Sequence, residues 1–274
     1  MAKSKNLFII DDETAPKLVD QLNPPGFGHG YDPLQKAANP MPMLAPPDQI
    51  KLIPRGEWSE RIKERKKQKA TGRDMKARMN GGKKHVSLDQ NGQGYCWGYS
   101  NTHVAMYCNA QANKPYKRLS AHAVCCVIKG FRDEGGWCGL SAKFIRERGI
   151  PSVDKWPEKS MSRSHDTAAT WEDARANVVT EDWVDLTRAV YDQSMTFDMV
   201  ASVLLSGGGF VAVDFNWWAH SVCAIDVVEV EPGSFGLDIQ NSWTDGWGED
   251  GCGILRGSRA IPDGAVCTRV VTGG

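Results

Sequence analysis

The stretch Gln90-Asn91-Gly92-Gln93-Gly94-Tyr95-Cys96-Trp97-Gly98-Tyr99-Ser100 decides how the rest of the chain is interpreted. It places Cys96 directly after a glycine-rich turn, where a helix over residues 97–110 is expected to begin. The positive end of a helix favours a thiolate, and the free N–H of the first turn can bind an oxyanion. Gln90 could add a second donor. The stretch therefore indicates a nucleophilic cysteine, with a buried structural cysteine as the alternative.

Two later blocks carry the side chains that a cysteine nucleophile requires. Trp217-Trp218-Ala219-His220-Ser221-Val222 places a histidine at the start of an apolar strand, and Asp238-Ile239-Gln240-Asn241-Ser242-Trp243 follows it. His220 would take the proton of Cys96 and stabilise the thiolate as an imidazolium. The carbonyl of Asn241 would accept from the other ring nitrogen and fix the tautomer. Alone, His220 would be a core histidine and the Asn-Ser-Trp segment a turn.

In their order and neighbours these blocks resemble the catalytic blocks of papain-like cysteine peptidases. A Gly246-Trp247-Gly248-Glu249-Asp250-Gly251 segment after Trp243 adds to the likeness. The resemblance implies an α+β fold, with a helical left half, a β-barrel-like right half and the active site in the cleft between them. It implies hydrolysis of peptide bonds through a thioester acyl-enzyme, with Gln90 in the oxyanion hole and Trp243 covering the Asn241–His220 hydrogen bond.

The same resemblance suggests residues that bind substrate. Gly135 and Gly136 would offer their backbone to the substrate in antiparallel fashion, and Cys138, Trp218 and Ser221 would border the pocket for the substrate's second residue.

The sequence also departs from the family. Tyr95 stands where a small residue is usual, so its ring is expected to narrow the cleft. Gln93 replaces a cysteine that is paired in secreted members.

The amino-acid composition of the chain changes near residue 85. Residues 1–85 are expected to form an N-terminal extension, and residues 86–274 the papain-like domain, mainly helical over 86–180 and mainly β over 181–274. Eight of the fourteen prolines lie between Pro24 and Pro54, which predicts an extended arm without helix or inner strand. Residues 61–84 hold eleven Lys or Arg against Glu64 and Asp74. A basic helix is expected over residues 57–79.

Further elements are predicted from periodicity and from glycine and proline stops. We expect helices over 120–131, 141–148 and 197–205, and strands over 210–215, 221–230, 235–240 and 266–271.

Composition narrows the remaining possibilities. The net formal charge is zero, no stretch approaches the length of a membrane span, and Leu7-Phe8-Ile9-Ile10 is too short for an export signal. Eight cysteines without an export signal predict reduced thiols and a cytoplasmic protein. His122 with Cys125 and Cys126 is interpreted as buried helix residues rather than half of a metal site. No cofactor or metal is expected.

Several alternatives stay open. The chain could be a docking component of a larger assembly, such as a viral particle, in which residues 1–85 hold a partner protein. Residues 61–84 could bind nucleic acid or an acidic surface, or could simply be solvated. The bond cleaved could be a peptidoglycan amide or an isopeptide instead of a backbone peptide. The extension lacks the helical signature of the family's inhibitory propeptide, because Arg65 stands where an aromatic residue is expected.

Overall fold

A seven-stranded sheet forms the centre of the computed structural model, which describes residues 7–39, 51–177, 183–188, 194–207 and 209–268. The strand order is β1-β6-β5-β4-β3-β7-β2. All neighbours are antiparallel except β1, which pairs with β6 in parallel. The strands are β1 (Ile9–Ile10), β2 (Trp183–Asp185), β3 (Val211–Phe215), β4 (His220–Glu231), β5 (Ser234–Gln240), β6 (Cys252–Arg256) and β7 (Gly264–Thr268).

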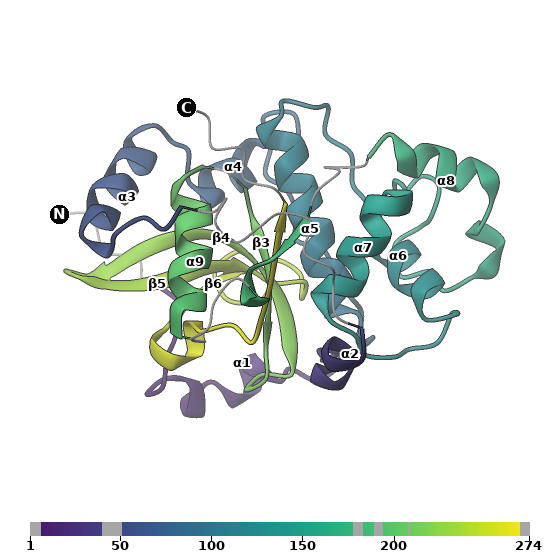
Figure 1. Ribbon diagram of the computed structural model, residues 1–274. Helices are drawn as coiled ribbons and strands as arrows, with labels where there is room; N and C mark the ends of the chain where they lie inside the picture. The colour runs from purple at the N-terminus through teal and green to yellow at the C-terminus, as the bar shows by residue number, and fades with distance from the viewer. Residues whose placement is uncertain (1–6, 40–50, 178–182, 189–193, 208, 269–274) are drawn as a thin grey trace.

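Helices flank the sheet on two sides (Figure 1). The α-helices are α1 (Val19–Leu22), α2 (Pro33–Ala38), α3 (Trp58–Lys67), α4 (Gly72–Arg78), α5 (Cys96–Gln111), α6 (Ala121–Ile128), α7 (Cys138–Arg148), α8 (Ala168–Arg175) and α9 (Ser194–Leu205). Short 3-10 helices are η1 (Ala15–Lys17), η3 (Arg55–Glu57), η4 (Arg163–His165), η5 (Leu186–Arg188) and η6 (Gly257–Ala260).

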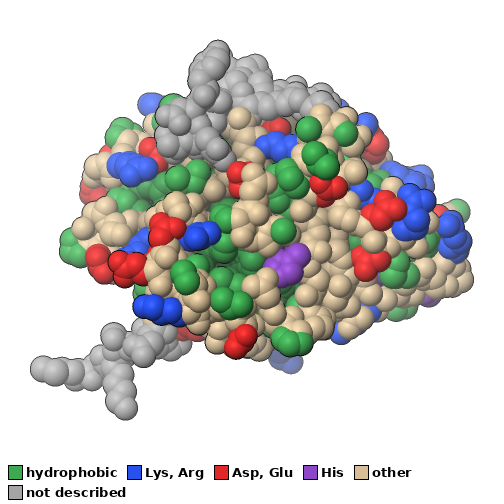
Figure 2. All heavy atoms as spheres, turned by 90° about the horizontal axis from the view of Figure 1, so that it is seen from below, with side chains coloured by type: hydrophobic (Ala, Val, Ile, Leu, Met, Phe, Trp, Pro, Cys, Tyr) green, Lys and Arg blue, Asp and Glu red, His purple; other side chains and the backbone are tan. Residues whose placement is uncertain are grey.

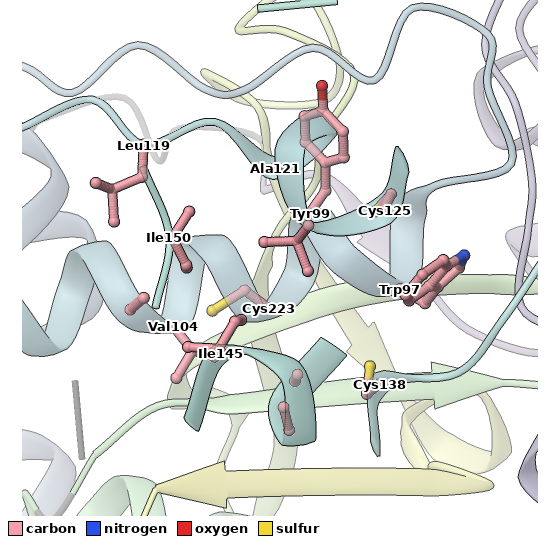
Figure 3. Close-up of a cluster of buried hydrophobic side chains, with 14 of the residues drawn as sticks. Trp97, Tyr99, Val104, Leu119, Ala121, Cys125, Cys138, Ile145, Ile150 and Cys223 are labelled. Atoms are coloured by element: carbon pink, nitrogen blue, oxygen red, sulfur yellow. The ribbon is translucent and has the colours of Figure 1, made fainter. Parts of the chain in front are cut away.

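Two hydrophobic clusters divide the interior. The first joins α5, α6 and α7, and includes Trp97, Val104 and Ile145 (Figure 3). The second lies between the sheet and α9, and Trp58 of α3 belongs to it. Burial of such large apolar side chains is the main force that holds each half together. The prediction of an α+β fold with a helical half and a β half is confirmed.

The N-terminal arm differs from the prediction. The proline-rich stretch was expected to contain no helix, yet α2 begins at Pro33. Asp32 caps α2 by accepting a hydrogen bond from the backbone N–H of Leu34, and proline is tolerated at the first helical position. Residues 40–50 of this stretch lie outside the described residues. In addition, β1 adds an edge strand from the arm to the sheet.

The basic segment is two helices rather than one. The helix expected over residues 57–79 stops after Lys67, because Lys69 adopts a left-handed backbone with φ 52°. A capping box between Thr71 and Asp74 then starts α4. The helix expected over 120–131 ends at Ile128, the one over 141–148 begins at Cys138, and residues 269–271 of the last predicted strand are not described.

Both basic helices pack on the sheet through charge pairs. Arg65 of α3 contacts Asp226 of β4 at 3.2 Å, and Arg73 of α4 contacts Asp238 of β5 at 2.7 Å. Both carboxylates are buried, so these pairs fix α3 and α4 of the N-terminal extension against the sheet. Among the described residues, none of the helices has the length and apolar character that a membrane span needs.

Candidate active site

Cys96 is the first residue of α5, as predicted. Tyr95 stands at the N-cap position, and the side chain of Cys96 is fully buried. The thiol therefore lies at the positive end of the longest described helix, which is the position that favours a thiolate once solvent can reach it.

His220 and Asn241 are brought together by neighbouring strands. His220 begins β4, and Asn241 follows the last residue of β5. The Nε2 atom of His220 lies 2.8 Å from the Oδ1 atom of Asn241, and both side chains are buried. Nδ1 of His220 has no hydrogen-bond partner among the described residues. Asn241 therefore holds one ring nitrogen and fixes the ring's orientation, and the other nitrogen is unpaired.

Ser221 connects this histidine to the cysteine. It follows His220 on β4, and its backbone and side chain are hydrogen-bonding neighbours of the Cys96 thiol. The start of α5 and the start of β4 thus meet at the thiol.

Gln90 and Trp243 complete the surroundings of the site. The backbone N–H of Gln90 donates to Ser242 O at 3.0 Å, and Ser242 Oγ donates to Gln90 Oε1 at 2.6 Å. These bonds leave Nε2 of Gln90 to donate elsewhere. The Trp243 ring lies 4.4 Å from the His220 ring, measured between centroids, and is itself buried. The indole ring of Trp243 therefore lies against the imidazole ring of His220.

Cys96 and His220 are not hydrogen-bonded to each other, because Nε2 of His220 binds Asn241 and Nδ1 has no partner among the described residues. Burial favours the neutral form of each side chain. Burial raises the pKa of the Cys96 thiol to about 12, and neighbouring groups of Ser221 and Gly30 only partly oppose this rise. Burial lowers the pKa of His220 to about 3, against the opposing effect of Asn241. Proton transfer from thiol to imidazole requires the reverse order of pKa values. The site as it stands therefore holds a thiol and a neutral imidazole.

A segment of the arm, residues 26–32, contributes to this burial, and we call it the strap. Its backbone lies over Cys96, His220 and Gln90. Gly30 N and Tyr31 N both donate to Ala219 O, next to His220, at 3.1 and 3.0 Å. Nε2 of Gln90 donates to Gly28 O at 2.7 Å. A peptide carbonyl thus occupies the donor that the sequence assigns to the oxyanion.

The strap also pairs with the two glycines that were predicted to bind substrate. Gly136 N donates to Gly30 O, and Asp32 N donates to Gly136 O, both at 2.8 Å. The bridge between Tyr31 and Gly136 is parallel. Gly135 packs closely on Gly30 O. The structure therefore shows a peptide backbone on Gly136, in the opposite direction to the one expected for a substrate.

Glycine is required where the strap crosses the nucleophile loop. A Cβ atom on Gly28 would overlap the backbone oxygens of Gly92 and Gln93, and one on Gly30 would overlap the backbone of Gly94. Only glycine allows two backbones to approach this closely. The sequence Gly26-Phe27-Gly28-His29-Gly30, with glycine at every second position, was the available signal for this contact.

The helix α1, which precedes the strap, is fixed by tryptophans of the right half. Trp218 Nε1 donates to Leu22 O at 2.9 Å, and Trp247 Nε1 donates to Gln21 O at 2.8 Å. His29 Nδ1 lies 2.8 Å from Trp218 O, and its ring is 5.3 Å from that of His220. Figure 2, turned to view the molecule from below, shows hydrophobic side chains and a histidine in the middle of that face. Trp218 thus contacts the strap rather than an open pocket.

Asp214 of β3 is a site residue that the sequence did not reveal. Its carboxylate is fully buried and accepts from Ser221 Oγ at 2.5 Å and from Cys138 Sγ at 2.8 Å. Its charge also raises the pKa of the Cys96 thiol. The signal was a single acidic residue in an otherwise apolar strand, Val211-Ala212-Val213-Asp214-Phe215. Buried carboxylates of this kind are common at functional sites.

Tyr95 does not narrow the cleft. Its hydroxyl donates to Arg132 O at 2.8 Å, and its ring packs near His122 and Trp97 in the core of the helical half.

His122 lies 2.5 Å from the Tyr99 hydroxyl, and burial lowers its pKa to about 4. Among the described residues no group of three or more His, Cys, Asp or Glu side chains is arranged to hold a metal ion. All eight cysteines are free thiols.

The sequence matches no protein family model and no curated protein. Solved structures do match. A recombinant stem bromelain precursor has a TM-score of 0.58 at 15% identity, over 95% of this chain and 89% of its own. Bromelain from Ananas comosus, in complex with the E64 inhibitor, has a TM-score of 0.54 at 18% identity, over 72% and 97%.

Two further likenesses come from other kinds of organism. Digestive procathepsin L 3 of Tenebrio molitor has a TM-score of 0.53 at 16% identity, covering 81% of this chain and 89% of its own. Xylellain, a cysteine protease from Xylella fastidiosa, has a TM-score of 0.52 at 16% identity, covering 68% and 83%. At these identities the likeness shows the fold alone. This chain has the fold of the papain-like cysteine proteases.

Proposed function

We propose that this protein is a cysteine peptidase that hydrolyses peptide bonds with Cys96, His220, Asn241 and Gln90. The observation that supports it most is the hydrogen bond between His220 and Asn241, with the second ring nitrogen unpaired beside the helix that begins at Cys96. Cys96 would attack the carbonyl, Gln90 Nε2 and the Cys96 N–H would bind the oxyanion, and His220 would protonate the leaving amine. Water would then hydrolyse the thioester.

The strap makes this peptidase latent. It already lies in the cleft as a peptide, yet its parallel bridge to Gly136 reverses the direction expected for a substrate, so its own carbonyls are not offered for attack. The strap also excludes the water that a thiolate and an imidazolium need, which keeps Cys96 and His220 neutral. Displacing the strap is therefore the step that would start catalysis.

The docking alternative is not favoured. Described parts of the extension contact their own domain, through β1 on the sheet and through Arg65 and Arg73, so holding them requires no outside partner. Binding of nucleic acid to residues 61–84, a cytoplasmic location and cleavage of other amide bonds remain predictions.

Digestion of a peptide library tests the proposal. The variant Gly30→Ala should displace the strap, because its Cβ would overlap the Gly94 backbone. We expect this variant to cut peptides faster than the wild type, and Gly30→Ala with Cys96→Ala to cut none. Gly56→Ala is the matched control, since its Cβ meets no atom within 4 Å. A folded Gly30→Ala protein that cleaves no peptide would refute the function.

A further inference from the structure

A cavity of about 690 Å³ lies at the end of α5 that is remote from Cys96. It is lined by residues of α3, of α4 and its following turn, of the C-terminal end of α5, and of the end of α9 (Figure 1). Cys96 begins α5, and Gln111, which lines the cavity, ends it. A helix of 16 residues is about 24 Å long, so this cavity is separate from the candidate active site. We call it the distal cavity.

The charged side chains in the wall of the distal cavity are basic. They are Arg65, Arg78 and Lys114, and the described residues of the wall include no aspartate or glutamate. The other basic side chains of α4, Arg73 and Lys76, each pair with an aspartate, whereas Arg78 Nη1 donates to a backbone oxygen at 2.6 Å. Because a peptide carbonyl does not neutralise a guanidinium, the charge of Arg78 is not offset by a carboxylate of the described wall.

Lys114 and Arg65 have donors left for a ligand. The carbonyls of residues 108–110 accept from backbone N–H groups of the following turn, so the end of α5 is capped without the Lys114 side chain. That side chain is exposed and forms no hydrogen bond or ion pair with another described residue. Arg65 binds Asp226 through Nε and Nη2. Its Nη1 lies 3.9 Å from the position that a Cβ on Gly207 would take, at the wall of the cavity.

The uncharged part of the wall suits a planar organic group. Tyr116 and Phe210 contribute aromatic rings, and Met75 and Met79 contribute flexible thioether chains. The Tyr116 hydroxyl lies 3.0 Å from Nδ1 of the buried His85, which holds its ring in position. A ligand that matches this wall therefore combines negative charge with a flat, partly apolar body.

We propose that the distal cavity binds a nucleoside phosphate, with its phosphate groups on Arg78, Lys114 and Arg65 Nη1 and its base against the aromatic rings. Guanidinium and ammonium groups bind phosphate through charge-assisted hydrogen bonds. Aromatic side chains stack on nucleobases, and the volume of the cavity lies within the roughly 300–1,000 Å³ of small-molecule sites. The inference does not depend on the proposed peptidase function, since it uses none of the candidate catalytic residues.

Calorimetric titration of the wild-type protein with ADP, pyrophosphate and adenosine tests the ligand class. We expect ADP to bind at one site, at least about tenfold more tightly than either pyrophosphate or adenosine, because only ADP uses both the cations and the aromatic rings. The affinity for ADP should fall as salt rises. Absence of ADP binding, or equal affinities for ADP and pyrophosphate, would overturn the inference.

Variants at exposed positions locate the site. Arg78→Met and Lys114→Met should each weaken ADP binding by about tenfold, since each removes a charged donor. Lys67→Met removes one exposed charge of α3 outside the cavity, and as the matched control it should change the affinity by less than about twofold. If a variant does not fold, the comparison of the three ligands still decides.

Two results would assign the cations to another role. An equal loss of affinity in Lys67→Met would mean that ADP binds the general positive surface and not the cavity. Single-stranded DNA that binds the protein and is not displaced by ADP, with binding lost in Arg78→Met, would mean that these cations hold a nucleic acid instead. Either result would overturn the inference. Peptide cleavage is measured in neither experiment, so the inference and the proposed function fail separately.

Discussion

At the scale of single residues, the proposed chemistry depends on one hydrogen bond, from His220 to Asn241. Three side chains and Gln90 were recognisable in the sequence because each stands in a short local block. Asp214 was not recognisable in this way, because its role depends on Cys138 and Ser221, which reach it only after β3, β4 and α7 have packed. Local motifs reveal nucleophiles, whereas contacts between distant segments require the fold.

Asn241→Ala tests the orienting role. The substitution removes the acceptor for His220 Nε2, so the ring loses its fixed tautomer. We expect kcat/KM in the Gly30→Ala background to fall about tenfold or more, with little change in KM, as the loss of one such bond implies. Asn177→Ala, which removes a buried amide far along the chain, is the control. Equal activity of the Asn241→Ala protein would contradict this role.

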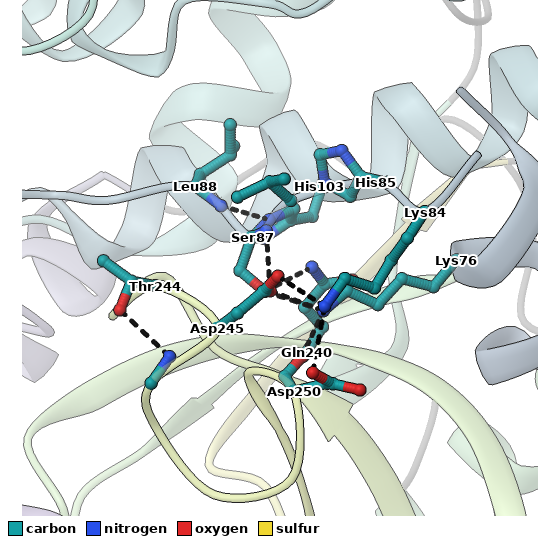
Figure 4. A network of polar contacts seen from close by, with 12 residues as sticks. Lys76, Lys84, His85, Ser87, Leu88, His103, Gln240, Thr244, Asp245 and Asp250 are labelled. Carbon is teal, nitrogen blue, oxygen red and sulfur yellow. Dashed lines mark hydrogen bonds and ion pairs between the residues drawn. The ribbon is translucent and has the colours of Figure 1, made fainter. Parts of the chain in front are cut away.

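At the scale of elements, helix α4 is tied to the loop that follows Asn241 (Figure 4). Lys76 is only 3% exposed, and its ammonium group contacts Asp245 Oδ1 and Ser87 Oγ, both at 2.9 Å. It also donates to the backbone oxygen of Asp250. The sequence showed a basic stripe but not its acidic partners, because a charge run alone does not reveal which of its members are buried.

Lys76→Met should therefore destabilise the protein. It removes the buried cation of Asp245 and leaves only the exposed Lys84 paired with that carboxylate at 3.0 Å. We expect the free energy of unfolding to fall by about 2 kcal/mol, less than for a fully buried pair, because Lys84 and solvent partly compensate the charge of Asp245. Lys83→Met, on the exposed turn after α4, should change it by less than about 0.5 kcal/mol. Urea unfolding of both variants measures this. Equal stabilities would mean that the Lys76 pair contributes nothing.

At the scale of the whole molecule, the described parts of the N-terminal extension pack on the papain-like domain. The predicted boundary at residue 85 marks a change in composition, and β1, the strap, α3 and α4 all contact later parts of the chain. The prolines and charges of residues 1–85 predict an extension because they resemble those of a linker. Its contacts with the sheet join residues more than a hundred positions apart, and no local pattern encodes them.

Buried histidines make the stability of this unit depend on pH. Burial, with Arg118 and Lys76 nearby, lowers the pKa of His85 to about 3. Between pH 6.5 and 3 the unfolded chain therefore binds a proton that the folded protein does not. Stability should fall as the pH drops through this window, by up to about 1.4 kcal/mol per pH unit for this group.

Unfolding of wild type and His85→Gln between pH 7 and pH 4 checks this. The variant should lose less stability on acidification than the wild type. His165→Gln, at a half-exposed position, should follow the wild-type curve. If the free energy of unfolding falls with pH equally in wild type and His85→Gln, protonation of His85 does not contribute to the pH dependence of stability.

The rate at which E64, the inhibitor bound in the bromelain structure, labels Cys96 tests the central claim most directly. Mass spectrometry locates the label among the eight cysteines. We predict that Gly30→Ala is labelled at Cys96 at least tenfold faster than wild type and Gly56→Ala, and that the label is absent when Cys96→Ala is added. Labelling of wild type at the same rate would contradict the covering role of the strap. A folded Gly30→Ala protein that stays unlabelled at Cys96 would contradict the nucleophile.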